Sequence, residues 1–265
     1  MVLTGDGGDE ALSGYPAYQS ERFVSGYQQL SGGVRHALEL GLSGLSKLIS
    51  GGAKYKLHRI VNVLRSSSGS FQERLLAKLA WIDLDMLEGV LEDRGVVRPI
   101  EDYLDEVFSA CQFDDPFYRL MYFHYHVSLP ERMLTKVDRV SMASSLECRA
   151  PFLDPRLVEL LAAVSKDVKM PKFERKYLLR TTVGKSLPKE IMRAPKKGFI
   201  PPLRCWLNES NTREYVQGGL LEKIGLSRSA LSELIRMNSS GEKDTGNFLW
   251  MVILLLRWVE TDEVC

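Results

Sequence analysis

The spacing of apolar residues along this chain predicts a mostly helical protein. Over residues 71–108, and again over 115–161, apolar side chains recur every three or four positions, which is typical of helices with one buried face. The second stretch has one expected stop at Leu129-Pro130, because a proline inside a helix removes a backbone hydrogen bond. The same pattern predicts further helices over 157–164, 174–185 and 247–259.

Extended segments are expected only beside loops that carry polar motifs. Met1 to Thr4 is apolar and leads directly into a glycine- and acid-rich loop, which indicates the last turn of a strand. We interpret the chain as one domain in three parts, namely a ligand-binding loop (1–15), a helical region (16–115) and a helical core with a lysine-rich loop (116–265).

Composition and charge exclude several classes of function. Lys and Arg together number 35 against 34 for Asp and Glu, so no strong overall field attracts nucleic acid or an anionic membrane. The longest apolar run, Phe248 to Leu256, is far shorter than the roughly 20 residues that a membrane span needs. Four scattered cysteines form no C-x-x-C pair, and no signal peptide begins the chain, so we expect a cytoplasmic protein without a zinc site.

The first candidate for chemistry is the loop Thr4-Gly5-Asp6-Gly7-Gly8-Asp9-Glu10, followed by Tyr15. Its three glycines allow a tight turn that brings backbone N–H groups close to a phosphate. Its carboxylates would repel a polyphosphate unless Mg²⁺ lies between them, and Asp9 or Glu10 could hold that ion. The alternative, a solvated or calcium-like acidic turn, stays open on the loop alone.

The second candidate runs from Leu129 to Asp154. Lys136 and Arg139 are three residues apart and share a helix face that could hold phosphates, although a solvated face explains most such pairs. Glu147 and Arg149 are interpreted as a buried ion pair that fixes the following loop.

The third candidate is the loop Arg193 to Pro202, which contains Lys196 and Lys197. A lysine on a loop stiffened by prolines could stabilise negative charge on a phosphate. A basic loop that is merely exposed to solvent is the alternative.

Two other kinds of site, a metal site at a histidine pair and a hydrolase site, find no support in the sequence, and the histidines are interpreted as structural. His124 and His126 are two residues apart, which is the wrong spacing for metal ligands on one helix face. A serine hydrolase of the α/β type would need a G-x-S-x-G turn, and the sequence has none.

Taken together and in this order, the three motifs resemble the synthetase domain of the glutamine-hydrolysing asparagine synthetases. That family has a Ser-Gly-(Asp or Glu)-Gly-x-Asp-Glu loop, which Thr4 to Glu10 matches with threonine in place of serine. Its Leu-Pro, Lys-x-Asp-Arg, Ser-Met-Ala, Glu-x-Arg and Pro-Phe-Leu-Asp series matches Leu129 to Asp154, and its Lys-Lys-Gly-Phe loop matches Lys196 to Phe199. The resemblance implies a mainly α chain that is the later portion of an α/β adenine-nucleotide-binding, ATP-pyrophosphatase-like synthetase domain.

The resemblance also implies a reaction and its cofactors. Aspartate attacks the α-phosphorus of ATP and releases pyrophosphate, and ammonia, which comes from glutamine in the full-length parent, then displaces AMP from the β-aspartyl adenylate. Carried over by position, the roles of the site residues are as follows: Thr4, Gly5, Gly7, Gly8, Tyr15 and Lys136 bind ATP, Asp9 and Glu10 bind Mg²⁺, and Asp6 and Lys196 are catalytic.

Departures from the family pattern limit these expectations. The family's amino-terminal cysteine is absent, and so is its Ser-Gly-Gly-x-Asp-Ser loop, since Ser31-Gly32-Gly33 continues without the acid and the serine. We therefore expect a carboxy-terminal fragment that is inactive alone and does not hydrolyse glutamine. The alternatives are a related adenylating amide ligase, such as a β-lactam synthetase or an enzyme of polysaccharide amidation, and a non-catalytic remnant. A homodimer is also compatible with the sequence.

Overall fold

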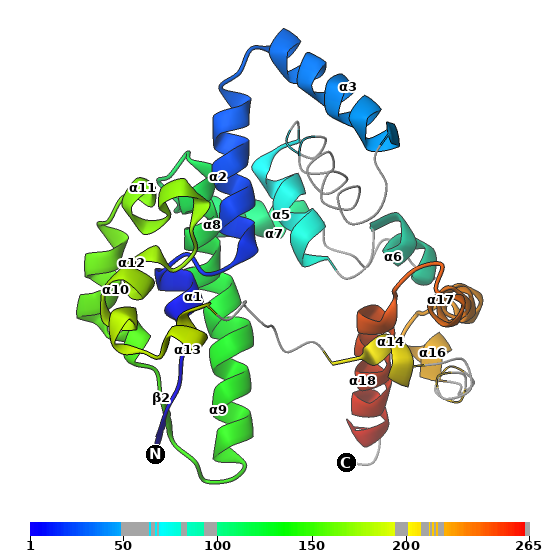
Figure 1. Cartoon of the computed structure of the whole chain (residues 1–265). Helices are drawn as coiled ribbons and strands as arrows, with labels where there is room; N and C mark the ends of the chain where they lie inside the picture. Colours follow the sequence, from blue (N-terminus) through cyan, green and yellow to red (C-terminus); the bar gives the residue numbers. More distant parts are fainter. Residues whose placement is uncertain are drawn as a thin grey trace. The chain divides into compact units, whose positions relative to one another are not determined.

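The computed structural model is mostly helical, as the apolar pattern predicts (Figure 1). It describes residues 1–48, 64, 67, 69–80, 84–92, 100–193, 201–207, 212, 214, 216 and 220–262. Within these residues the strands are β1 (Val2–Leu3) and β2 (Cys148–Arg149). The α-helices are α1 (Gly8–Ala11), α2 (Pro16–Gln28), α3 (Gly32–Leu48), α5 (Phe71–Leu79), α6 (Leu84–Val90), α7 (Ile100–Phe108), α8 (Pro116–Phe123), α9 (Thr135–Met142), α10 (Pro155–Ala162), α11 (Lys166–Lys169), α12 (Tyr177–Thr181), α13 (Lys189–Arg193), α14 (Leu203–Trp206), α16 (Leu220–Lys223), α17 (Arg228–Ser240) and α18 (Gly246–Asp262).

The chain divides into two compact units. The first comprises Met1–Leu75 and Glu101–Pro195, and the second comprises Leu76–Ile100 and Lys196–Cys265. All the described residues of the first two motifs belong to the first unit, which therefore holds the candidate site.

In the first unit, α2 packs along α8. The side chains of Tyr18 and Phe117 are fully buried there, with ring centroids 5.3 Å apart. A buried ion pair joins α2 to α5, because Arg74 Nη2 lies 2.9 Å from Glu21 Oε2 and both side chains are at most 3% exposed. These contacts support the end of α2 that follows the glycine-rich loop.

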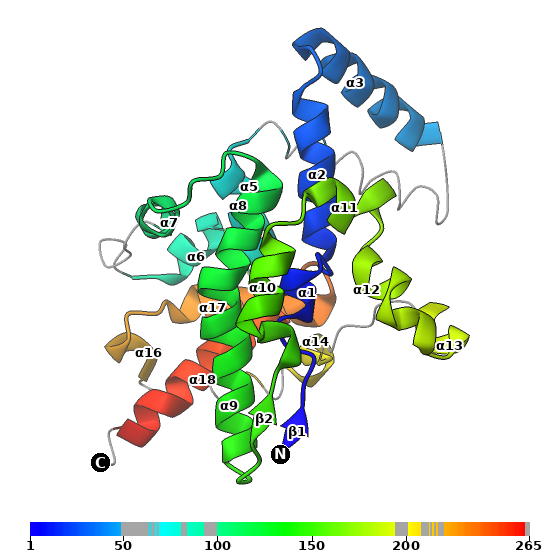
Figure 2. The same ribbon diagram turned by 90° about the vertical axis from the view of Figure 1, so that its left-hand side faces the viewer.

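The expected helix stop at Leu129-Pro130 is wrong. The chain continues from α8 through a π-helix, His124–Leu134, into α9, and Pro130 lies inside the π-helix. Figure 2 shows α8 and α9 as one continuous column. A π-helix bonds residues five apart, so its wider turn accommodates the proline that would break an α-helix. The Thr135 hydroxyl also donates to the Pro130 carbonyl at 2.8 Å.

The helix predicted over 174–185 is shorter than expected. The structure has α12 over Tyr177–Thr181, followed by a 3-10 helix, Val183–Ser186. Lys172, Phe173 and Lys176 have positive φ angles of 51°, 62° and 53°, which prevents a regular helix before Tyr177.

The second unit has its own apolar core around α18. The predicted helix over 247–259 is confirmed, with bounds Gly246–Asp262. The buried residues of this apolar core are Val90, Leu203, Leu207, Val216, Leu221, Leu226, Leu231, Leu234, Ile235, Phe248, Leu249, Val252, Ile253 and Leu256. Among the described helices, none combines the length and the apolarity that crossing a membrane requires.

Candidate functional site

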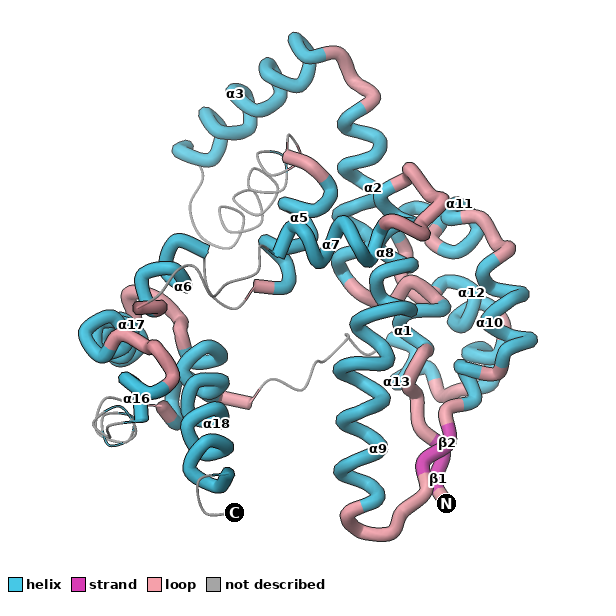
Figure 3. Tube along the Cα trace, turned by 180° about the vertical axis from the view of Figure 1, so that it is seen from behind, coloured by secondary structure: helices cyan, strands magenta, loops and turns pink. Residues whose placement is uncertain are grey.

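Two short parallel strands bring the first two motifs together. Val2 is opposite Cys148 and Leu3 is opposite Arg149. The Thr4 N–H donates to the Arg149 carbonyl at 2.8 Å, immediately before the glycine-rich loop begins. Figure 3 shows the two strands side by side next to the amino terminus. Residues almost 150 positions apart in the sequence therefore meet where both strands end.

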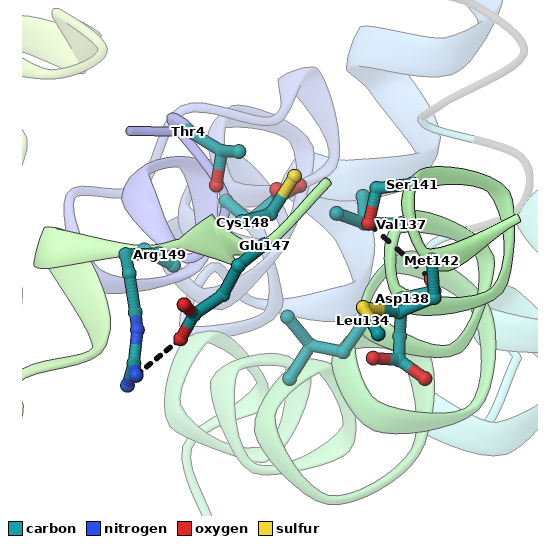
Figure 4. Close-up of a pocket in the computed structure, with 11 residues that line it drawn as sticks. Thr4, Leu134, Val137, Asp138, Ser141, Met142, Glu147, Cys148 and Arg149 are labelled. Carbon is teal, nitrogen blue, oxygen red and sulfur yellow. Dashed lines mark hydrogen bonds and ion pairs between the residues drawn. The ribbon is translucent and has the colours of Figure 1, made fainter. Parts of the chain in front are cut away.

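A cavity of about 340 Å³ lies at this meeting point. Figure 4 shows residues of the β1 and β2 segments on one side and residues of α9 on the other. The lining residues are Thr4, Asp6, Leu134, Val137, Asp138, Ser141, Met142, Glu147, Cys148, Arg149 and Ala150. The volume is within the range of pockets that bind small molecules.

The charged groups of this pocket are mostly acidic. Asp6, Asp138 and Glu147 supply three carboxylates. The fourth charged residue, Arg149, forms an ion pair with Glu147, as the sequence suggests. The pair is not buried as expected, since the side chains of Arg149 and Glu147 are 65% and 53% exposed. An anionic ligand here would need a cation between itself and the carboxylates.

The glycines of the first motif allow it to pack closely against the Pro-Phe-Leu-Asp turn. Gly7 has φ 82°, and a Cβ at this position would lie 2.2 Å from Leu153 Cδ2. A Cβ on Gly8 would lie 3.1 Å from the Phe152 ring. The first motif therefore depends on the second for its conformation as well as for its pocket.

The two predicted metal ligands have other partners in the structure. Asp9 Oδ1 lies 2.7 Å from Lys176 Nζ. Glu10 is 2% exposed and accepts a hydrogen bond from the Tyr15 hydroxyl at 2.7 Å, and its burial raises the pKa of its carboxyl group. Neither residue lines the pocket. Across the described ranges, no cluster of three or more His, Cys, Asp or Glu residues could hold a metal ion.

Tyr15 links Glu10 to a buried histidine. The ring centroids of Tyr15 and His124 are 4.8 Å apart, and those of Tyr18 and His124 are 5.5 Å apart. Burial, together with the charge of Arg132, lowers the pKa of His124 to about 4, so its ring is neutral near pH 7. The structural interpretation of His124 fits this environment.

Lys136, the described one of the predicted phosphate-binding lysines, does not line the pocket. Lys136 is exposed, and its Nζ lies 3.8 Å from Met133 Sδ. The part of α9 that faces the pocket consists of Val137, Asp138, Ser141 and Met142. Lys196, together with Lys197 of the same loop, lies outside the described residues.

Sequence reasoning missed three residues of this region. Asp138 lies between Lys136 and Arg139 in the sequence, and it lines the pocket, whereas Lys136 and Arg139 do not. Cys148 becomes a lining residue only through the strand pairing. Lys176 had no local signal, because its partner Asp9 is 167 positions away.

Comparison with known proteins agrees with the motifs. A family model described as asparagine synthase matches residues 1–260. A putative glutamine-hydrolyzing asparagine synthetase of Mycobacterium tuberculosis is 25% identical over 97% of this chain and 39% of its own length. Asparagine synthetase 1 of Bacillus subtilis, also named as glutamine-hydrolyzing, is 22% identical over 97% of this chain and 40% of its own length.

A relative that matches less of this chain has another name. The protein named amidase chyE of Penicillium rubens is 24% identical over 78% of this chain and 33% of its own length. No solved structure gives a significant match. The chain thus spans about two fifths of the length of the curated synthetases that it matches.

Proposed function

Because this chain belongs to the asparagine synthase family of ligases, we propose that it forms the synthetase part of an ATP-dependent amide ligase that acts on aspartate. In the first step the side-chain carboxylate of aspartate attacks the α-phosphorus of ATP, so that an acyl phosphate bond forms and pyrophosphate leaves. In the second step ammonia attacks the activated carbonyl, and AMP leaves with the bonding electron pair. The products are asparagine, AMP and pyrophosphate.

The observation that carries this proposal is the pocket between the first two motifs. Strand pairing brings Thr4 and Asp6 into one cavity with Glu147 and Arg149. Thr4 and the turn Gly5-Asp6-Gly7-Gly8 would contact ATP, and Asp6 would face the reacting carboxyl group. The Arg149 guanidinium is a cation within reach of an anionic substrate, because it is well exposed in spite of its ion pair.

One or two carboxylates together with phosphate oxygens are the usual ligands of Mg²⁺, so a carboxylate of the loop would hold the ion only together with the bound nucleotide. A bound Mg²⁺ would neutralise the pyrophosphate as it leaves. The Asp9 carboxylate is 18% exposed and is the ligand that we propose, on condition that it separates from Lys176. Glu10 is a weaker candidate, since it is buried and accepts the Tyr15 hydrogen bond. Lys136 and Tyr15 keep their proposed roles in ATP binding, and Lys196 keeps its proposed catalytic role.

A second candidate function is the same chemistry on another carboxylate. The match to a protein named amidase chyE favours this second candidate. A neutral amide product would form in both cases, so the identity of the carboxylate separates the two candidates.

The experiment measures products in the 265-residue chain and in a form extended upstream to the length of the relatives. Each is incubated with Mg²⁺, ATP and ammonium, with aspartate, glutamate or no amino acid. In the extended form we expect asparagine, AMP and pyrophosphate in equal amounts with aspartate only, and we expect no product from the 265-residue chain alone. Formation of ADP and phosphate, or AMP formation with a different carboxylate only, would overturn the assignment to aspartate.

A further inference from the structure

The Asp9 carboxylate already has a cation beside it that belongs to the protein. Lys176 Nζ lies 2.7 Å from Asp9 Oδ1, and both side chains are largely shielded, at 31% and 18% exposure. The ammonium group of a lysine and a Mg²⁺ ion both bind carboxylate oxygens, so they compete for the same atoms. The charge of Lys176 would oppose a metal ion at this position.

The backbone holds Lys176 in place. Lys176 has φ 53° and precedes α12, in a left-handed conformation that is unfavourable for a residue with a Cβ. Its N–H donates to the Leu12 carbonyl at 3.2 Å, which ties it to the end of α1. Strain of this kind persists where the surroundings impose it, and it is concentrated at functional sites.

Gly14 completes the arrangement. A Cβ at Gly14 would lie 1.9 Å from Asp9 Oδ1 and 2.5 Å from Lys176 Cε. The Gly14 N–H donates to the Asp9 carbonyl at 2.7 Å. Because Gly14 has no side chain, the ion pair between Asp9 and Lys176 can lie directly against the backbone of Gly14.

We propose that Lys176 is a positioning residue of the site. Its ammonium group holds the Asp9 carboxylate, and Mg²⁺ must compete with Lys176 to bind that carboxylate. The inference rests on the proposed function for the identity of its ligand. It predicts that the metal affinity of the loop is set by Lys176: Mg²⁺ binds Asp9 only when the ion pair opens. Lys176 thus neutralises the charge of the Asp9 carboxylate until Mg²⁺ binds together with the nucleotide.

The test measures binding of Mn²⁺, which accepts the same oxygen ligands as Mg²⁺, to the 265-residue chain without ATP or aspartate. Electron paramagnetic resonance reports the free ion directly. The variants are Lys176→Met and Lys176→Gln, with Lys172→Met as the matched control. Lys172 is exposed on the same segment, so its replacement removes the same charge and leaves the ion pair intact. Circular dichroism verifies that each variant is folded, and the use of two variants at position 176 guards against loss of folding in one.

We expect Lys176→Met and Lys176→Gln to bind Mn²⁺ about tenfold more tightly than the wild type, the scale of removing a charge in direct contact near the surface. Lys172→Met should change the affinity less than about twofold, because solvent and salt screen its charge. Lys176→Arg should bind as the wild type does, and adding Asp9→Asn to Lys176→Met should abolish the gain.

Equal affinity of the wild type and both Lys176 variants would overturn the proposal, as would a gain that survives Asp9→Asn. The assay contains no substrate. A gain in Mn²⁺ affinity together with absent ligase activity would therefore leave this inference standing while the proposed function fails.

Discussion

His124 illustrates how a single buried residue can link stability to pH. Its ring packs against Tyr15 and Tyr18, and no group among the described residues forms a hydrogen bond with either ring nitrogen. Its pKa falls from 6.5 to about 4 on folding, first because of burial and second because of Arg132, with Asp9 acting in the opposite direction. Below pH 6.5 the unfolded chain therefore gains a proton that the folded chain does not bind, and stability falls as the pH falls towards 4.

Replacement of His124 by phenylalanine should remove this contribution while keeping an aromatic ring. In urea denaturation, the wild type should lose up to about 3 kcal/mol of unfolding free energy between pH 6.5 and pH 4 relative to His124→Phe. The comparison cancels other groups such as Glu10, whose raised pKa acts in the opposite direction. Parallel pH profiles for the two proteins would contradict the buried, neutral state of His124.

Lys169 is a buried cation in the first unit. Its side chain is 1% exposed, its Nζ lies 3.7 Å from Met121 Sδ, and burial lowers its pKa from 10.5 to about 8. Between pH 8 and 10.5 the unfolded chain binds the extra proton, so this group makes the folded state more stable as the pH rises.

Lys169→Met should remove that rise of up to about 3 kcal/mol and should stabilise the protein at pH 7, where the wild type buries a charge. Urea denaturation at pH 7 and at pH 10 measures both effects, with exposed Lys172→Met as the control for surface lysines. A loss of stability in Lys169→Met at pH 7 would mean that the ammonium has a stabilising role that its surroundings do not reveal.

The glycine-rich loop and the turn after β2 behave as one structural element. Gly7 has a left-handed conformation, and its Cα faces Leu153. Gly7→Ala should cost roughly 2–4 kcal/mol of unfolding free energy, the sum of backbone strain and overpacking. Gly5→Ala is the matched control, because a Cβ at Gly5 meets nothing within 4 Å.

A double variant separates the two costs. In the Leu153→Ala background, Gly7→Ala should no longer cause overpacking. The loss of unfolding free energy on going from Leu153→Ala to the double variant should therefore contain only the backbone strain at position 7. Equal costs for Gly5→Ala and Gly7→Ala in thermal or urea denaturation would contradict the packing of the loop on the turn.

Elements with local signals were predictable from the sequence, and contacts between distant segments were not. The period of apolar residues predicts α18, and the apolar segment Met1 to Thr4 before the glycine- and acid-rich loop predicts β1. Pro130 misleads because the rule for proline describes α-helices, whereas the π-helix around it depends on its neighbours. Asp6 lines the pocket that the motifs suggest, but the Asp9–Lys176 pair arises from a contact across the fold.

At the scale of the whole molecule, the pocket lies where two motifs of the matched family meet. The match to the asparagine synthase family covers residues 1–260. The pocket joins the two described motifs of that family through the pairing of β1 with β2. We propose on this basis that the pocket takes part in the activation of a carboxylate by ATP.

The most direct test of this account is aspartate-dependent exchange of labelled pyrophosphate into ATP in the presence of Mg²⁺. It should be measured in the 265-residue chain and in a form extended upstream to the length of the relatives, each with and without Asp6→Asn. We predict exchange that requires aspartate in the extended form and falls at least about 100-fold in Asp6→Asn, the usual cost of losing a group that acts in the transition state. Absence of exchange with aspartate in every form, or exchange that Asp6→Asn leaves unchanged, would contradict it.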